Sequence, residues 1–172
     1  MLPILIAYAS KYGGTAGIAE RIGTMLHADG FPVEVRRAEE IEDVAPYSAV
    51  IIGSGVYAGQ WLKPVTHLLE QHSLILSQKP VWLFSSGPTG EGDASTLMKG
   101  YRYPDTMRQT IEAIQPRAIA FFHGVLNLEK LNFAERLIIR TVRAPVGDFR
   151  DWASINAWAQ GIADALREKL PV

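Results

Sequence analysis

Short apolar runs that alternate with helical patterns constrain the fold of this chain more than any other feature. Ile4–Ala9 is apolar without polar alternation, which is typical of a strand buried on both faces of a sheet. The segment after it carries apolar residues at helical spacing and stops at Gly30. Strands that are separated by helices predict βαβ units, and therefore a parallel sheet with helices on both faces.

Five strands and four later helices follow from the same patterns. The predicted strands are Ile4–Ala9, Phe31–Arg37, Ala49–Gly55, Pro80–Ser85 and Ala118–Gly124. The predicted helices after the first one are Pro64–Ile75, Thr106–Ile114, Asn132–Arg143 and Trp152 to Leu170. Asn132 and Glu135 have the spacing of a capping box, and Asp151 is the expected N-cap of the last helix. The pattern predicts a doubly wound, five-stranded α/β domain that spans residues 1–172.

Composition excludes several classes of function. The 172 residues carry a net charge of −1, so no basic footprint for nucleic acid is present. The chain has no cysteine, which excludes disulfides, thiol nucleophiles and Cys-type metal sites and fits a reducing cytoplasm. No apolar run approaches the roughly 18 residues of a membrane span, and we expect the N-terminus to be a strand instead of a signal peptide.

The loop after the first strand has the composition of an anion site. In doubly wound sheets, ligands bind beyond the carboxyl ends of the strands. Ser10-Lys11-Tyr12-Gly13-Gly14-Thr15 follows the first strand and leads directly into a helix. Its glycines permit close backbone approach, and the N–H groups at a helix start attract anions. An unliganded Gly-rich turn is the alternative interpretation of this loop.

Two more Gly- and Ser-rich loops follow the third and fourth strands. Residues 53–61 combine small residues with Tyr57 and Trp61, which suits a flat aromatic ligand. Trp61 alone is equally well explained as a cover for the sheet edge. Residues 85–90 again offer glycines and hydroxyl groups. Three such loops at one edge of the sheet predict a single ligand site.

The first loop resembles the flavodoxin phosphate loop through Ser10, Gly13 and Thr15, and the similarity covers nearly the whole chain. The resemblance implies a flavodoxin-like sheet with strand order 2-1-3-4-5 and non-covalent binding of flavin mononucleotide (FMN). It implies no catalytic side chain and no metal, since FMN itself carries the electrons. The cofactor-binding residues that it predicts are Ser10, Lys11, Tyr12, Gly13, Gly14, Thr15, Ser54, Gly55, Val56, Tyr57, Ala58, Gly59, Trp61, Ser85, Ser86, Gly87 and Pro88.

Within that superfamily, the chain is most similar to the branch that contains menaquinone-dependent protoporphyrinogen dehydrogenase. The similarity rests on Tyr57–Trp61, Gly124–Leu126, Phe133–Arg140 and Asp151-Trp152. Two features depart from that branch: Tyr57 stands where a basic residue is expected, and Ser86–Asp105 is rich in Gly, Pro and Ser instead of basic residues. A connection of about 20 residues is long for a compact domain, and we expect it to serve as a substrate lid.

Histidines contribute little to the predicted chemistry. His123 ends the fifth strand, and we expect it to be a hydrogen-bonded structural residue away from the three loops. His27, His67 and His72 fall on helices and are expected at the surface. No His, Asp and Glu spacing suggests a metal site, and the G-x-S-x-G motif of a nucleophile elbow is absent.

The Asn132–Arg143 helix allows two interpretations. Phe133, Leu137, Ile138 and Thr141 form an apolar stripe that Ile139 and Val142 widen, with Arg136, Arg140 and Arg143 opposite. An ordinary helix packed on the sheet is one interpretation. The other is a peripheral surface for a membrane or a quinone. Because the helix follows the fifth strand, we expect it to lie outside the flavin loops.

Three functions remain open at this stage. The first is an FMN-dependent oxidoreductase that moves electrons between an organic substrate and a quinone-like acceptor. The second is a carrier flavodoxin that docks transiently on redox proteins; such carriers are usually strongly acidic, unlike this chain with its charge of −1. The third is a flavodoxin-like fold that has no cofactor.

Overall fold

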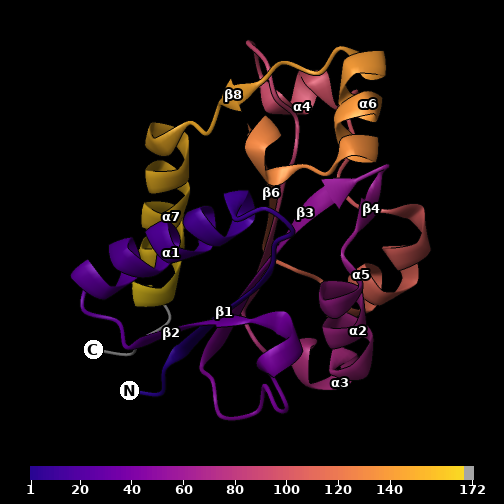
Figure 1. The fold of residues 1–172 in the computed structure, drawn as a ribbon. Coiled ribbons are helices and arrows are strands. Elements are labelled where there is room, and N and C mark those ends of the chain that lie inside the picture. Colours follow the sequence, from indigo (N-terminus) through magenta and orange to yellow (C-terminus); the bar gives the residue numbers. More distant parts are fainter. Residues whose placement is uncertain (169–172) are drawn as a thin grey trace.

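The computed structural model describes residues 1–168, and its centre is a parallel sheet of five strands (Figure 1). The strands are β1 (Ile4–Ala9), β2 (Val33–Arg37), β3 (Ala49–Tyr57), β5 (Val81–Ser86) and β6 (Ala118–Phe122). They pair in the order β2-β1-β3-β5-β6, with β2 and β6 at the edges. The doubly wound fold and the 2-1-3-4-5 order of the main strands are therefore confirmed, since the short β4 (Gln60–Trp61) pairs only with β3.

Two apolar layers cover the faces of the sheet. One contains α1 (Gly14–Ala28) and α7 (Trp152–Arg167), which lie side by side in Figure 1. The other contains α2 (Lys63–Gln71), α3 (Ser73–Leu76) and α5 (Arg108–Ile114). Central strands contact both layers, which explains the unbroken apolar runs of β1, β3 and β5. The expected end of the last helix at Leu170 lies outside the described residues.

Most element predictions agree with the structure within a few residues. Asp151 caps α7 by accepting hydrogen bonds from two backbone N–H groups, as expected. The helix predicted at Pro64–Ile75 is interrupted at His72, which separates α2 from α3. The prediction that His72 lies at the surface is wrong, because its side chain is buried where the helix breaks. Two 3-10 turns, η1 (Ala38–Glu40) and η2 (Asp105–Met107), complete the connections on this face.

Two excursions lie beyond the carboxyl ends of the strands, at the top of Figure 1. The first is the connection after β5, which contains the short helix α4 (Ala94–Leu97). The second follows β6 and consists of β7 (Val125–Leu126), η3 (Leu128–Lys130), α6 (Phe133–Val142) and β8 (Gly147–Asp148). We call residues 125–148 the cover segment. Its two ends are held together because β7 and β8 pair antiparallel.

Candidate functional site

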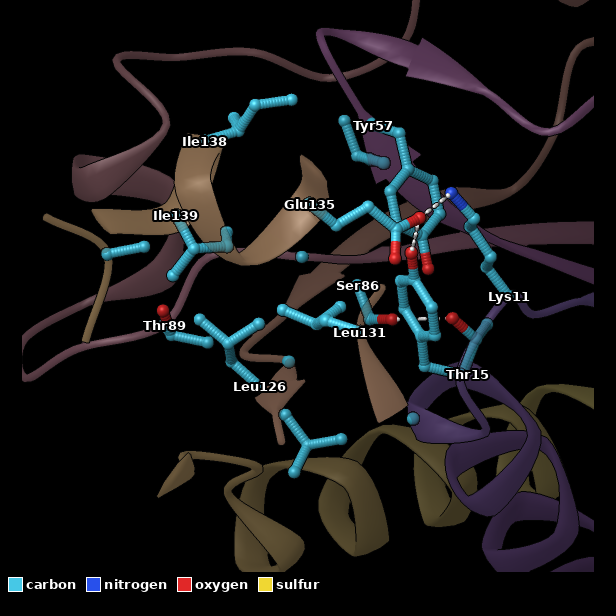
Figure 2. A pocket seen from close by; sticks show the side chains of 17 residues that line it. Lys11, Thr15, Tyr57, Ser86, Thr89, Leu126, Leu131, Glu135, Ile138 and Ile139 are labelled. Carbon is cyan, nitrogen blue, oxygen red and sulfur yellow. Dashed lines mark hydrogen bonds and ion pairs between the residues drawn. The ribbon is translucent and has the colours of Figure 1, made fainter. Parts of the chain in front are cut away.

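A cavity of about 380 Å³ lies where the carboxyl ends of β1, β3, β5 and β6 meet the cover segment (Figure 2). The first predicted loop contributes Lys11, Tyr12, Gly14 and Thr15 to its wall. The later two loops contribute Val56, Tyr57, Ser86 and Gly87. The structure therefore brings the three predicted loops together around one cavity.

The first loop is held in shape by its own side chains. Gly13 is the N-cap residue of α1 and has a φ of 93°, a left-handed conformation that favours glycine. Its N–H donates to the Ser10 hydroxyl at 3.0 Å. Arg150 forms a bidentate ion pair with Asp148 and also donates to the carbonyl of Gly14. Within residues 1–168 no side chain caps the start of α1, so the helix presents its positive end to the cavity.

Buried hydroxyl groups join the loops beneath the cavity. Thr15 and Ser86 share a hydrogen bond of 2.8 Å between their side-chain oxygens. The indole of Trp61 donates to Ser85 at 2.9 Å, and both residues are buried away from the cavity wall. The prediction of Trp61 as a stacking residue is therefore wrong, because its ring belongs to the sheet edge. Ser54 is also buried, and its hydroxyl accepts a hydrogen bond from the N–H of Leu62.

Tyr57 is the aromatic residue that the second loop brings to the cavity. Its ring meets that of Tyr12 edge to face, with centroids 6.1 Å apart. Burial raises the pKa of Tyr57, so its hydroxyl stays neutral near neutral pH. The next two residues, Ala58 and Gly59, form the exposed β3–β4 turn and do not line the cavity, although both were predicted as flavin residues. Ala58 has a φ of 49°, which is strained for a residue with a Cβ.

Helix α6 lies against the first loop, contrary to the sequence prediction. Lys11 donates to Glu135 at 2.7 Å, and the hydroxyl of Tyr12 donates to the same carboxylate oxygen. These bonds lower the pKa of Glu135 to about 2, with the Lys11 bond as the larger cause. The second carboxylate oxygen accepts the N–H of Asn132 and completes the predicted capping box. Lys130 also reaches the loop, because its ammonium donates to the carbonyl of Tyr12 at 2.9 Å.

The other half of the cavity is apolar. Leu131 is buried, and Leu126, Ile138 and Ile139 extend this wall beside it (Figure 2). At its base, the end of β6 meets the third loop. A Cβ added to Gly124 would lie 3.0 Å from the carbonyl oxygen of Gly87, so glycine permits this close backbone contact.

His123 lies beside the third loop, not away from it. Its Nε2 is 2.7 Å from the carbonyl oxygen of Gly92, and its Nδ1 is 3.3 Å from that of Pro88. Pro88 itself does not line the cavity, whereas Thr89 does. The remainder of the Ser86–Asp105 connection lies elsewhere: the hydroxyl of Tyr101 donates to the carbonyl of Gly59. The segment that covers the cavity is therefore α6 instead of the predicted lid.

The residues that the cover segment contributes to the cavity were not predicted from the sequence as site residues. These are Val125, Leu126, Leu131, Glu135, Ile138, Ile139 and Ala144, together with Thr89 and Gly124. One signal was available, since the Gly124–Leu126 stretch also follows a strand at its carboxyl end. By contrast, no local pattern indicates that α6 folds back onto the first loop.

The residues present fit a flavin nucleotide. An uncapped helix start behind a left-handed glycine suits a phosphate, and Lys11 and Lys130 supply cations beside it. Val56, Tyr57 and Gly87 offer a wall of apolar surface and backbone for an aromatic ring. Gly55 is needed there, because a Cβ would lie 2.8 Å from the ring of Tyr57.

Comparisons with known proteins identify the family of this chain. A family model described as "Flavodoxin domain" matches residues 5–152. The chain therefore belongs to the flavodoxin-domain family. The comparison with curated proteins found no match.

Solved structures share the fold. Rubredoxin oxygen:oxidoreductase from the anaerobe Desulfovibrio gigas superposes with a TM-score of 0.67 at 17% identity; it covers 100% of this chain, which spans only 38% of that protein. A flavodoxin from the domain Archaea gives 0.63 at 12% identity, with 96% and 99% of the two chains covered. Flavodoxin 2 from Bacillus cereus gives 0.59 at 20% identity, with 98% and 99% covered.

Proposed function

We propose that this protein is an FMN-dependent oxidoreductase whose second substrate is a flat, apolar molecule of the quinone type. One observation carries the proposal: a single cavity joins the phosphate-loop residues of a flavodoxin-domain protein to an apolar chamber under α6. The family supports the proposal of a flavin in one half of this cavity. The apolar half comes from this chain's own cover segment and provides space for a reaction partner.

The proposed roles of the residues follow from their positions. Backbone N–H groups of residues 11–15 hold the phosphate, with the ammonium of Lys11 nearby. Val56, Tyr57 and Gly87 flank the ring, and Thr15 and Ser86 fix the loops relative to each other. When bound, FMN supplies one- or two-electron chemistry. Leu126, Leu131 and Ile139 exclude water from the chamber where the second substrate binds.

A quinone suits the chamber better than a porphyrinogen does. Quinone rings are apolar except for two carbonyl oxygens, and the residues around the chamber are mainly Leu and Ile. Protoporphyrinogen carries two carboxylates, and the cations Lys11, Lys130 and Arg150 beside the cavity all contact the first loop instead of the apolar chamber. We therefore propose a quinone as the electron acceptor and treat protoporphyrinogen as a donor to be tested by turnover.

A carrier flavodoxin is the competing function. The family and the long coverage of the archaeal flavodoxin favour it. A carrier exchanges electrons at the exposed flavin edge with a protein partner and needs no chamber for a second small molecule. The apolar cavity beneath α6 therefore favours the enzyme.

We also propose that the outer face of α6 contacts an anionic membrane from the cytoplasmic side. Phe133 is 84% exposed and Leu137 is 55% exposed. Arg140 was predicted to lie opposite this stripe, but it follows Phe133 by about two turns and therefore lies on the same face. Apolar side chains bordered by arginine suit the headgroup region of an anionic bilayer. None of the described helices combines the length and apolar character that crossing a membrane requires.

Flavin titration tests the first half of the proposal. FMN should bind with loss of its fluorescence and more tightly than riboflavin, because the phosphate adds charge-assisted hydrogen bonds. Equal affinity for both flavins would contradict the proposed phosphate site.

The second half of the proposal is tested by mixing the reduced FMN protein with menadione or with ferricyanide. Ile139→Ser should slow reoxidation by menadione while leaving ferricyanide reduction and FMN affinity unchanged. Equal rates of reoxidation by menadione for the wild type and Ile139→Ser would favour the carrier function.

The membrane proposal has a separate test, which is sedimentation with phosphatidylserine vesicles. Arg140→Glu should weaken vesicle binding, whereas Lys63→Glu, an identical charge change on α2, should not. Loss of binding in both variants would indicate attraction by overall charge without a specific surface, and no vesicle binding by the wild type would refute the surface.

A further inference from the structure

Glu135 is the one acidic residue among the described residues that line the cavity. Its carboxylate accepts hydrogen bonds from Lys11 and from Tyr12, two members of the first loop (Figure 2). We call Glu135, Lys11 and Tyr12 the Glu135 cluster. The side chains of Glu135 and Lys11 are 23% and 49% exposed, so solvent weakens this ion pair without separating the two groups. A protein carboxylate thus lies at the loop that the proposed function assigns to a phosphate dianion.

This arrangement sets two anions against each other. Lys11 is the cation of the cluster, and its hydrogen bond to Glu135 raises its pKa and keeps it charged. A phosphate at the first loop would gain from the same ammonium and from the positive end of α1. A carboxylate that keeps its place beside that phosphate would repel it. The two anions therefore compete for Lys11.

The cluster is also an attachment point of α6. No residue of α6 is buried, in contrast to α1 and α7, so apolar packing holds this helix weakly. The cluster and the bond from Lys130 to the carbonyl of Tyr12 connect the cover segment to the first loop. The pairing of β7 with β8 holds only the ends of the segment. Release of Glu135 would thus loosen α6 over the apolar chamber.

We propose that Glu135 is an intramolecular competitor of the flavin phosphate, and that occupation of the phosphate loop releases α6 from the cluster. Lys11 exchanges its carboxylate partner for a phosphate, and the chamber under α6 becomes accessible to the second substrate. The inference rests on the proposed function, since it needs a phosphorylated flavin at the first loop. It adds a residue that sets the preference for FMN over riboflavin and links flavin occupancy to the cover.

The decisive experiment compares Glu135→Gln with the wild type in titrations with FMN and with riboflavin. Glutamine still serves a capping box, so α6 keeps its start while the negative charge is lost. The variant should bind FMN about tenfold more tightly, because one repulsion is removed and Lys11 is freed. Riboflavin affinity should stay unchanged, since riboflavin lacks the phosphate. Glu129→Gln, on the neighbouring η3, is the matched control and should leave both affinities unchanged.

Limited trypsin digestion reports on α6, which carries the exposed sites Arg136 and Arg140 and ends at the exposed C-cap residue Arg143. FMN should speed cleavage of the wild type at these sites, whereas riboflavin should not. Glu135→Gln should be cleaved quickly without any ligand. An unchanged or smaller ratio of FMN to riboflavin affinity in Glu135→Gln would overturn the competition, and protection of α6 by FMN would overturn the release. If the wild type binds neither flavin, the proposed function itself fails, which is a different result.

Discussion

The body of the sheet and the cover segment are stabilised by different interactions. The central strands β1, β3 and β5, together with α1 and α7, bury most of their apolar side chains, as Phe84 at 0% exposure illustrates. Helix α6 buries none of its residues, and the cover segment is attached to the first loop through the Glu135 cluster and the bond from Lys130 to the carbonyl of Tyr12. The proposed flavin half of the cavity is therefore built on rigid elements, while its apolar half depends on polar contacts that can exchange. The difference separates binding of a cofactor from access of a substrate.

The largest expected effect is a loss of stability in the body that has no counterpart in the cover. Phe84 packs edge to face against Trp158, and its ring lies directly over Gly53. Phe84→Ala should lower the free energy of unfolding by about 3–5 kcal/mol. Phe133→Ala on α6 removes the same kind of ring from a site that is 84% exposed. It should change the free energy of unfolding by less than about 0.5 kcal/mol. Urea denaturation measures both values.

A similar loss of stability in the two phenylalanine variants would break the comparison. It would mean that α6 packs against the body in solution. A large change in the denaturant slope of Phe84→Ala would instead indicate a change in the unfolded or native ensemble.

The next effect separates strain from ligand contact within the body. Gly13 and Gly30 have nearly the same φ, 93° and 90°, at opposite ends of α1. Valine at either position should lower stability by about 1–2 kcal/mol through the left-handed backbone. Only Gly13→Val should abolish FMN binding, because the new side chain stands at the phosphate loop. FMN titration of both variants measures this difference. Loss of FMN binding in Gly30→Val as well would mean that backbone strain alone, and not contact with the ligand, abolishes binding.

Much of the body could be predicted from sequence, for a physical reason. Buried strands and amphipathic helices leave strong local patterns, and strand ends of a doubly wound sheet meet at one edge by topology. The position of the first loop at the cavity, the capping box of α6 and the cap of α7 were predicted correctly from a few neighbouring residues each. Trp61 was included among the flavin residues although the sequence left its place open, because an aromatic residue in a loop suits a ligand and a sheet edge equally well.

The cover segment could be predicted as a helix but not as part of the site. The contact of Glu135 with Lys11 joins residues 124 positions apart in the chain. Its formation depends on the path of residues 125–131, which no periodicity describes. The sequence pattern predicted only the local role of Glu135 in the capping box, which its second carboxylate oxygen performs by accepting the N–H of Asn132. His72 was misplaced for a similar reason, because the break between α2 and α3 turns it inward.

A smaller effect is expected at the β3–β4 turn, where strain is stored beside the cavity. Ala58 and Gly59 both have positive φ, the pattern of a type I′ turn that favours Asn or Gly. Ala58→Gly should raise the free energy of unfolding by about 0.5 kcal/mol, since relief of strain exceeds the added freedom of the unfolded chain. Ala28→Gly, at the end of α1, should be destabilising instead. Destabilisation of both variants to the same degree would show that the turn carries no strain.

The smallest and most local effect concerns acid and the Glu135 cluster. The pKa of Glu135 falls from 4.5 to about 2 in the folded protein, chiefly through the hydrogen bond from Lys11. A carboxylate with a depressed folded pKa stabilises the fold fully above its unfolded pKa, and that contribution is lost as pH falls. We therefore expect α6 to loosen between about pH 4.5 and pH 2, before or without unfolding of the sheet.

Amide hydrogen exchange across this range should show protection falling in α6 while β3 and β5 stay protected. Glu135→Gln should already show fast exchange in α6 at neutral pH, with no step at acidic pH. An acid-dependent step of equal size in that variant would assign the loosening to other carboxylates, and α6 would then be attached to the body by contacts other than this cluster.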